Sequence, residues 1–394
     1  MGGFKLTTWN VEWLVHAFRV DTGAVPAGAR QRNHRMPSAE QAKAKLEAIR
    51  EEISLIDPDI LLLTEAIPDP EEMSEFVRTY LPNYVLIDRA GQSKQSYHIR
   101  GDQWMWFLTK PEIKEKRRAH LLDNATWFAY TKKIYTSQRA RRQHRDGYWW
   151  ISLPHIDKKS GLVGAHELKS HCHHRHPQVL VIDWEGGRIE FIGVHLKSKF
   201  TGDRVPTRQP NEKDKDYYAR ADVRRFMAKA VQARAKLTTE ATDVRHYIDH
   251  RFAQEPLPAI FLLGDLNDGP GKELLEREYM LHDLIGNLQG DVFFARQFLS
   301  HALFDSSDRF RWTVEFKDEL DPSRRPYILL DHIIFTEALT RRGKCPLIVH
   351  PRMGRVEHEI HDRVASVVPA KTTISDHRPV SLVVSERSAD VPGS

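Results

Sequence analysis

Two short stretches decide how this chain is expected to fold: Phe261-Leu262-Leu263-Gly264-Asp265-Leu266-Asn267-Asp268 and, further on, Ser375-Asp376-His377-Arg378-Pro379-Val380. In the first, an apolar run typical of a buried strand stops at carboxylate and amide groups. In the second, a carboxylate and an imidazole stand directly before an apolar run that continues to Val384. Because side chains at strand ends lie along one rim of a sheet, both stretches predict metal ligands or acid–base groups at such a rim.

Other apolar runs of the chain end in the same kinds of polar group. Seven strand tips in chain order carry them: Asn10 with Glu12, Glu65, Asp102, His195, Asp265 with Asn267, Asp331, and Asp376 with His377. Any one of these is more often structural than catalytic, since polar residues commonly end strands and cap loops. The whole set is hard to explain in that way, and it favours an assembled active site.

The rest of the chain alternates short apolar runs with few long helices. Strands are predicted over 4–9, 60–63, 84–87, 104–108, 179–182, 189–194, 260–263, 328–335 and 380–384. Helices are predicted from the cap at Ser38 to the break at Asp57, and over 71–80, 217–237 and 272–278. A doubly wound parallel sheet would need a crossover helix between most strands. The pattern therefore predicts an α+β fold in which two packed, mainly antiparallel sheets are flanked by helices as a four-layer α/β-sandwich.

We expect residues 1–385 to form one domain and 386–394 a flexible tail. Residues from about 117 to 170 interrupt the strand rhythm and are interpreted as an insertion. This insertion carries the basic run Arg139–Arg145 and the aromatic run Tyr148–Trp150. Two interpretations of it stand: an arm that binds nucleic acid, or a solvated arm whose aromatic rings pack on the core.

Composition limits the class of protein. The 394 residues carry a formal net charge of +5, which suits a polyanionic partner but is weak evidence alone. Two cysteines, Cys172 and Cys345, give no disulfide framework, so a reducing compartment such as the cytoplasm is expected. The first residues lack the features of a secretion signal, and no apolar run approaches the ~18 residues of a membrane span.

The residue types at the strand tips suit metal-assisted cleavage of a phosphate ester. Charge on the phosphoryl oxygens must be neutralised, and Mg²⁺ or Mn²⁺ with oxygen ligands performs that task. Glu65 and Asn10 are predicted to hold the metal, with Asp376 or Glu12 assisting.

The same reaction needs a group that activates water and groups that stabilise the transition state. Asp265 and Asn267 are predicted to position or activate the water. His195 and His377 are predicted to act as general acid or base and as charge stabilisers. Each imidazole needs a carboxylate to orient it, and the candidates are Asp102 for His195 and Asp331 for His377.

In this order the motifs resemble those of the endonuclease/exonuclease/phosphatase superfamily, which has the deoxyribonuclease I-like fold. The matching segments are Thr8-Trp9-Asn10-Val11-Glu12, Leu61–Glu65, Gly193–Lys199, Gly264–Asp268, Leu330–Ile333 and Ser375–Pro379. Two weaker matches are the strand that follows Asp102 and the sequence Arg175-His176-Pro177. The resemblance implies that Arg175 contacts a phosphate, and Lys197 and Lys199 are further predicted substrate contacts.

The leading hypothesis is a bacterial-type, metal-dependent phosphodiesterase that hydrolyses nucleic acid, with DNA favoured. The alternative is a phosphatase or phospholipase of the same fold that acts on a small phosphorylated or lipid head group. A non-catalytic binding module is disfavoured, because every catalytic position holds a competent residue. The His/Cys run His171–His176 matches no standard zinc spacing and is interpreted as a polar loop.

Overall fold

The computed structural model describes residues 2–31, 34–88, 101–132, 147–157, 159–269, 284–317 and 322–387. The basic run Arg139–Arg145, the helix predicted over 272–278 and nearly all of the predicted tail lie outside the described residues.

The first of two large sheets contains both the first and the last of the described strands. Its strand order is β17-β19-β1-β4-β6-β5, with β18 also paired to β19. β1 and β4 run parallel, and the other described pairs of this sheet are antiparallel. The bounds are β1 Gly3–Asn10, β4 Ile60–Ala66, β5 Val85–Leu86, β6 Trp104–Thr109, β17 Leu347–Ile348, β18 Gly354–Val356 and β19 Val380–Glu386.

The second large sheet has the order β13-β16-β12-β11-β10-β7. Only β11 and β12 are parallel among its described pairs. The bounds are β7 His120–Leu121, β10 Gln178–Trp184, β11 Gly187–His195, β12 Ala259–Asp265, β13 Leu299–His301 and β16 Asp331–Thr336. The expectation of two mainly antiparallel sheets is confirmed, and the hairpin predicted between 179–182 and 189–194 is formed by β10 and β11.

One predicted strand, 328–335, is divided in two. β15 (Tyr327–Ile328) pairs with β14 (Val314–Glu315), whereas β16 begins only at Asp331. The break is held by Thr313, whose Oγ1 accepts the backbone N–H groups of Leu330 and Asp331 at 3.1 and 3.3 Å. A continuous apolar pattern does not reveal this break, because both halves are buried.

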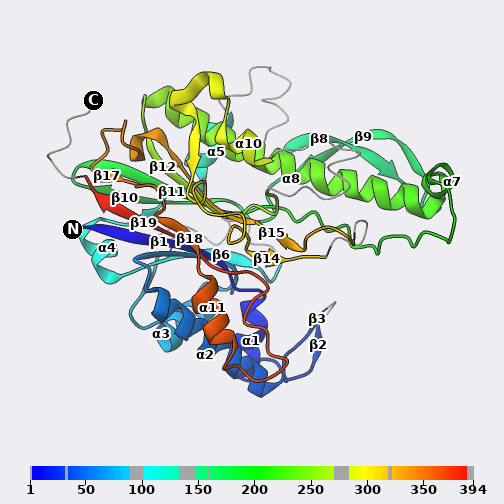
Figure 1. Ribbon diagram of the computed structural model, residues 1–394, viewed down its shortest axis with the longest axis horizontal. Helices are drawn as coiled ribbons and strands as arrows, with labels where there is room; N and C mark the ends of the chain where they lie inside the picture. Colours follow the sequence, from blue (N-terminus) through cyan, green and yellow to red (C-terminus); the bar gives the residue numbers. More distant parts are fainter. Residues whose placement is uncertain are drawn as a thin grey trace.

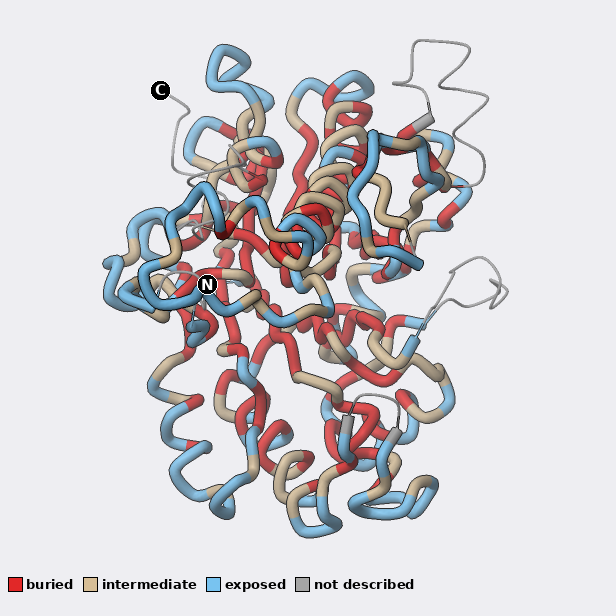
Figure 2. Tube along the Cα trace, turned by 90° about the vertical axis from the view of Figure 1, so that its right-hand side faces the viewer, coloured by how far each residue is buried: buried red, intermediate tan, exposed pale blue. Residues whose placement is uncertain are grey.

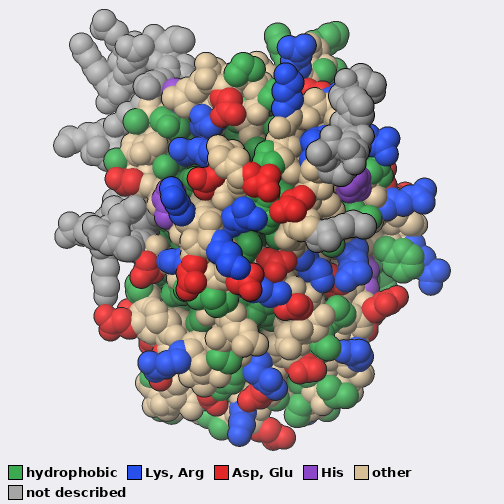
Figure 3. All heavy atoms as spheres, turned by 90° about the vertical axis from the view of Figure 1, so that its left-hand side faces the viewer, with side chains coloured by type: hydrophobic (Ala, Val, Ile, Leu, Met, Phe, Trp, Pro, Cys, Tyr) green, Lys and Arg blue, Asp and Glu red, His purple; other side chains and the backbone are tan. Residues whose placement is uncertain are grey.

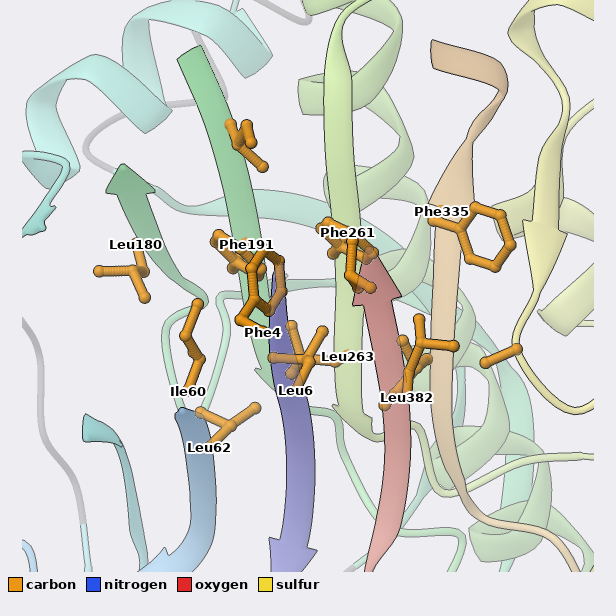
Figure 4. Packing of buried hydrophobic residues seen from close by; sticks show 14 of the residues in the cluster. Phe4, Leu6, Ile60, Leu62, Leu180, Phe191, Phe261, Leu263, Phe335 and Leu382 are labelled. Atoms are coloured by element: carbon orange, nitrogen blue, oxygen red, sulfur yellow. The ribbon is translucent and has the colours of Figure 1, made fainter. Parts of the chain in front are cut away.

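The core lies between the two sheets. In Figure 4, side chains from both sheets point toward one another, among them Phe4 and Leu382 from one sheet and Phe191 and Phe261 from the other. The Phe191 and Phe261 rings stack at a centroid distance of 5.0 Å, and Phe4 meets Phe191 edge-on at 5.7 Å. Fully burying each such ring contributes about 1.5–3 kcal/mol, so this interface is a major source of stability.

Helices cover the outer face of each sheet and complete four layers (Figure 1). One sheet is covered by α1 (Leu14–Asp21), α2 (Ala39–Ile56), α3 (Pro70–Tyr80) and α11 (His358–Ala365). The other is covered by α5 (Asn124–Lys132), α8 (Ala221–Gln254) and α10 (Leu284–Gln289). Figure 2 shows the buried segments concentrated in the middle of the molecule and the exposed ones on outer loops and helix faces.

Four further short helices lie in the connecting segments or on the arm described below. They are α4 (Pro111–Lys116), α7 (Asp214–Ala219), η2 (Val292–Gln297) and η3 (Glu337–Leu339). β2 (Arg30–Gln31) and β3 (His34–Arg35) form a separate short pair. The cap predicted at Ser38 is confirmed: its hydroxyl accepts the Gln41 N–H at 3.1 Å, and the Gln41 side chain accepts the Ser38 N–H at 3.0 Å.

An arm projects from the sandwich. It consists of α7, the first half of α8, and the hairpin of β8 (Trp149–Ile156) and β9 (Val163–His171), which lies beside α8 (Figure 1). Trp149, Ile151 and Leu153 are buried against α8, whereas Trp150 is 47% exposed. Within the described part of 117–170, β7 belongs to a large sheet and the hairpin forms a sheet of its own. Among the described residues, no helix has both the length and the apolar character to cross a membrane.

Candidate active site

Strand register brings the predicted site residues to one edge of the sandwich. His195 pairs with Asp265, and Asp265 pairs with Asp331 on the next strand. In the other sheet, Asn10 ends β1 beside β4, which carries Glu65. The two edges meet where the Asn10 amide nitrogen donates to Asp265 Oδ2 at 3.0 Å.

Asp265 is at the centre of this group and is almost fully buried. Its Oδ1 accepts the Asn267 N–H at 2.8 Å, and its Oδ2 lies 3.5 Å from Nε2 of His195. Burial raises the pKa of Asp265 to about 7; Asp331 adds to that shift, while His377 and the hydrogen bonds oppose it. A carboxyl with such a pKa exchanges its proton near neutrality, which is the property of a general base.

His377 and Asp331 form the pair that the sequence predicts. Nδ1 of His377 donates to Oδ2 of Asp331 at 2.7 Å, and both side chains are buried. Burial opposes charge on the ring, but Asp331, and then Asp265 and Asp376, hold the pKa of His377 well above its usual value. His377 is therefore an imidazolium, placed to stabilise negative charge.

His195 has the opposite charge state. Burial, followed by the charges of Arg175 and His377, lowers its pKa well below the usual value, so the ring is neutral. Its Nε2 faces carboxylate oxygens of Asp265 at 3.5 Å and Glu65 at 3.9 Å, which places the proton on Nε2. The ring is thus a hydrogen-bond donor toward the site.

The predicted partnership of Asp102 with His195 is not present. Nδ1 of His195 has no hydrogen-bond partner in the described part of the chain, and the Asp102 charge acts on Arg19 instead. The neighbouring residue, Gln103, faces the site: its Oε1 accepts from Nη1 of Arg175 at 2.9 Å. A one-residue difference at the start of a strand changes which side chain faces inward, and the sequence motif did not resolve it.

Arg175 holds the backbone that follows β11. Its Nε donates to the carbonyl of His195 and its Nη2 to that of Leu196, both at 3.1 Å. Asn267 supports the same segment, because its side-chain amide donates to the Leu196 carbonyl at 3.0 Å. Both residues line the cleft described below, but most of their hydrogen bonds hold the loop that carries His195.

Glu240 on α8 is a site residue that sequence reasoning missed. This buried carboxylate accepts the Lys197 N–H at 2.9 Å and Nε2 of His171 at 3.0 Å. His173 bonds to Asp243 one turn further, at 3.1 Å. The His171–His176 run therefore joins the arm to the catalytic loop through carboxylates. In the sequence, the signal for this role was one glutamate, buried in the fold, within a basic helix. Hydrophobic periodicity alone does not distinguish such a residue from an ordinary core residue.

The two predicted substrate lysines are already engaged. Nζ of Lys199 lies 3.1 Å from Oδ1 of Asp268, a fully buried carboxylate. Nζ of Lys197 donates to the Ser198 carbonyl at 2.8 Å. Lys197 retains donor capacity toward the cleft, since an ammonium has three N–H groups.

Asn10 differs from its predicted role as a metal ligand. Its Oδ1 accepts the Glu12 N–H at 3.0 Å, so the amide presents its NH₂ group to Asp265 and to Glu65, the latter at 3.3 Å. The reverse orientation would place an amide oxygen against two carboxylates and an NH₂ group against an N–H. Asn10 therefore bridges carboxylates in this arrangement.

Carboxylate oxygens are available for a hard cation beside Asn10. Oε2 of Glu65 accepts the Trp13 N–H at 3.1 Å, and Asp376 is exposed at the rim. Oε2 of Glu12 is buried without a hydrogen-bond partner among the described residues, and the nearest cation is Lys45 Nζ at 3.7 Å. Burial raises the pKa of Glu12, and Asp376 and Glu65 raise it further. These are oxygen donors of the kind that a hard divalent ion prefers, and one of them is buried without a hydrogen-bond partner among the described residues, although the three side chains do not all come within 4.8 Å of one another.

A second group of ligand atoms, from Asp265, Asp331 and His377, lies within 4.8 Å of one another. Its charges are already compensated, because the imidazolium of His377 stands between the two carboxylates. The Glu65, Glu12 and Asp376 oxygens are therefore the better candidates for a metal.

Two adjoining histidines, the buried His332 and the partly buried His301, support the loop behind Asp265. Nε2 of His332 donates to the Asp268 carbonyl at 2.8 Å, so its Nδ1 must accept from Nε2 of His301, also at 2.8 Å. Nδ1 of His301 in turn accepts the Leu303 N–H at 3.0 Å. Every ring nitrogen is thus assigned, and both rings must be neutral. Burial, above all, lowers the pKa of both.

This pair predicts loss of stability in acid. Because the folded-state pKa values are depressed, the unfolded chain binds more protons below about pH 6.5, and the free energy of unfolding falls by up to ~1.4 kcal/mol per pH unit for each ring. His301→Gln should make the fall between pH 6.5 and 5.5 shallower by about one proton, measured by urea denaturation. The exposed His120→Gln is the matched control, and equal slopes in all three proteins would contradict the assignment.

The catalytic groups lie in one large cleft of about 1170 Å³. Glu65, His195, Asp265 and His377 line it together with residues from the base of the arm, from the 198–205 loop and from β14. The cleft is thus formed by both sheets and by the arm.

Two face-to-face sheets with this set of carboxylates and histidines at one edge define a deoxyribonuclease I-like protein. The chain belongs to the endonuclease/exonuclease/phosphatase family, whose model matches residues 7–377. Members of this family are metal-dependent phosphoesterases and nucleases.

Several solved structures are similar to this chain over nearly its whole length, at low sequence identity. Truncated Caenorhabditis elegans TDP2 is 12% identical, with a TM-score of 0.46 and coverage of 98% of this chain and 98% of that one. A family protein from Bacteroides thetaiotaomicron is 10% identical (TM-score 0.42, 97% of each chain). The human Nocturnin catalytic domain with bound sulfate is 15% identical (TM-score 0.39, 98% of this chain and 95% of that one). No curated protein matches the chain.

Proposed function

We propose that this protein is a Mg²⁺-dependent phosphodiesterase that hydrolyses nucleic acid, with DNA as its substrate. The observation that carries the proposal is the size and lining of the cleft. Its volume of about 1170 Å³ exceeds the roughly 300–1,000 Å³ of small-molecule pockets. Arg204, Lys236 and Lys317 line it in addition to Arg175, and such a lining suits a polymeric anion better than a small phosphorylated head group.

The residues divide the chemical work according to their charge states. Asp265 accepts the proton of the attacking water, since its pKa of about 7 leaves it able to gain and lose a proton. The His377 imidazolium, held by Asp331, stabilises charge on the phosphoryl group. Neutral His195 donates a hydrogen bond from Nε2, and Arg175 holds its loop in place.

Glu65, Glu12 and Asp376 would hold the divalent metal, either Mg²⁺ or Mn²⁺. When bound there, the ion supplies charge neutralisation for the phosphoryl oxygens. Asn10 links Glu65 to Asp265 through its NH₂ group and so sets the ligand side chain relative to the base. Both described cysteines are free thiols, which supports the proposal of a reducing compartment such as the cytoplasm.

The test is a substrate panel with purified full-length protein. Supercoiled plasmid, single-stranded DNA, RNA and small phosphate monoesters are incubated with Mg²⁺, with Mn²⁺ or with EDTA. We expect metal-dependent cleavage of DNA that EDTA abolishes. Phosphate release from small monoesters without cleavage of any polymer would overturn the proposal in favour of a phosphatase.

A further inference from the structure

We propose that the cleft binds an unpaired polynucleotide strand, whose bases stack on Phe200 and Phe316 next to the reacting phosphate. This inference rests on the proposed function and names its substrate class. It is carried by two exposed aromatic rings and three cations without acidic partners, all of which line the same cleft as the catalytic groups.

Phe200 is fixed close to the catalytic histidine. It stands five positions after His195 and directly after Lys199, whose ammonium is bound to Asp268. Its N–H donates to Ser198 Oγ at 3.1 Å, so the turn that presents it is ordered. The ring itself is 74% exposed. An anchored backbone with a solvent-exposed ring is the arrangement of a stacking platform.

Phe316 is fixed close to the other catalytic histidine. Val314, two residues earlier, pairs with His377 as a β-bridge, and the Arg378 N–H donates to the Thr313 carbonyl at 2.9 Å. The Phe316 N–H is bonded to the Pro326 carbonyl at 2.6 Å, yet the residue is 40% exposed. The two rings are therefore tied to His195 and His377, the two groups that act on the phosphate.

Three of the cations that line the cleft lack a counter-charge among the described residues. Arg204, Lys236 and Lys317 form no ion pair with a carboxylate among the described residues. Lys197 is partly buried near two more cations: burial lowers its pKa, and Arg175 and Lys236 lower it further. On the face seen in Figure 3, by contrast, Lys and Arg side chains are interspersed with Asp and Glu. Like charges gathered beside the catalytic site suit a strand that brings several phosphates.

The exposed rings select an unpaired strand over a duplex. Bases in a duplex already stack on one another, and their faces are closed to a protein side chain. An unpaired base can lie flat on a phenyl ring, which contributes about 1–3 kcal/mol per base and depends little on sequence. Stacking on the two rings therefore adds affinity only for a strand whose bases are free.

The first experiment measures how removal of each phenyl ring changes the affinity for single-stranded and duplex DNA. Labelled single-stranded DNA and a blunt duplex of the same sequence are titrated by fluorescence anisotropy against Phe200→Ala, Phe316→Ala and the double variant, each in an inactive Asp265→Asn background. The control is Phe293→Ala, a 91% exposed ring outside the cleft. We expect roughly 10-fold weaker binding of the single strand for each ring and on the order of 100-fold for both, with duplex binding changed less than threefold and the control unchanged.

The outcomes separate this inference from the proposed function. If wild-type protein cleaves DNA but the double variant binds the single strand as tightly as Phe293→Ala does, the inference fails and the nuclease stands. Equal losses for single strand and duplex also overturn it. If wild-type protein cleaves no polynucleotide, the proposed function itself fails. Thermal melting of each variant verifies that its fold is retained.

Salt dependence tests the cations independently. Each phosphate contact to a single strand contributes about 0.7 to the slope of log affinity against log salt. Lys236→Ala and Lys317→Ala should each reduce that slope by about 0.7, whereas the exposed Lys344→Ala, which lies outside the cleft, should leave it unchanged. Identical slopes for the wild-type protein and the three variants would show that the strand does not contact this surface.

Discussion

Asp265→Asn is expected to lower the rate of metal-dependent phosphodiester hydrolysis by about a thousandfold or more, with the fold retained. The carboxylate is buried, faces both histidine rings and has a pKa of about 7. An amide of the same shape cannot accept the proton of the attacking water. The change should appear in the rate at saturating substrate and metal.

The fold should tolerate this substitution because two effects oppose each other. Asp265 accepts N–H groups from Asn10 and Asn267 on separate oxygens, and an amide offers only one acceptor. That loss costs about 1–3 kcal/mol, whereas removal of a buried carboxylate relieves a desolvation penalty of comparable size. The exposed Asp305→Asn is the matched control. Full activity in a folded Asp265→Asn protein would refute the assigned role.

Gly264→Ala should be the most destabilising glycine-to-alanine substitution in the described catalytic strands. Gly264 has φ +130°, and a Cβ placed there would lie 1.9 Å from the Val194 carbonyl oxygen on the neighbouring strand. Backbone cannot yield as a flexible side chain can, so β12 would have to separate from β11. We expect a loss of about 4 kcal/mol or more, seen as a lower urea midpoint.

Gly186→Ala provides the matched control for that substitution. Gly186 also has a positive φ, +79°, but nothing lies within 4 Å of its added Cβ. Only the left-handed backbone conformation is penalised there, at about 1–2 kcal/mol. Equal urea midpoints for the two variants would show that the close approach of β11 and β12 does not require glycine.

Much of the fold follows from local pattern. Continuous apolar runs such as Ile60–Leu63 predict strands buried on both faces, and β4 and β12 are such strands. Ser38 and Asp57 mark the ends of α2 because capping is a local interaction within one turn. The break between β15 and β16 was not predictable, since the hydroxyl that holds it comes from Thr313, outside the apolar run.

Some features of the candidate site could likewise be predicted from the sequence, and others could not. Motif order identified the strand tips, and the His377–Asp331 pair was predicted from them. The predicted partner of His195, Asp102, does not meet that ring, and its neighbour Gln103 faces the cleft instead and accepts from Arg175. Glu240 and the His301–His332 pair gave no motif, since their roles arise only where α8 and β16 meet the catalytic loops.

The kinds of chemical group at the strand ends, and their order along the chain, follow from the amino-acid sequence alone. That information is local, because a strand end and its polar tip are adjacent in the chain. The charge states and the division of roles arise from contacts between segments that are distant in the chain. His195 and His377 are the same residue type, yet burial beside Arg175 keeps one neutral while contact with Asp331 charges the other. Electrostatic energies depend on distances and burial between segments far apart in sequence, which no local pattern contains.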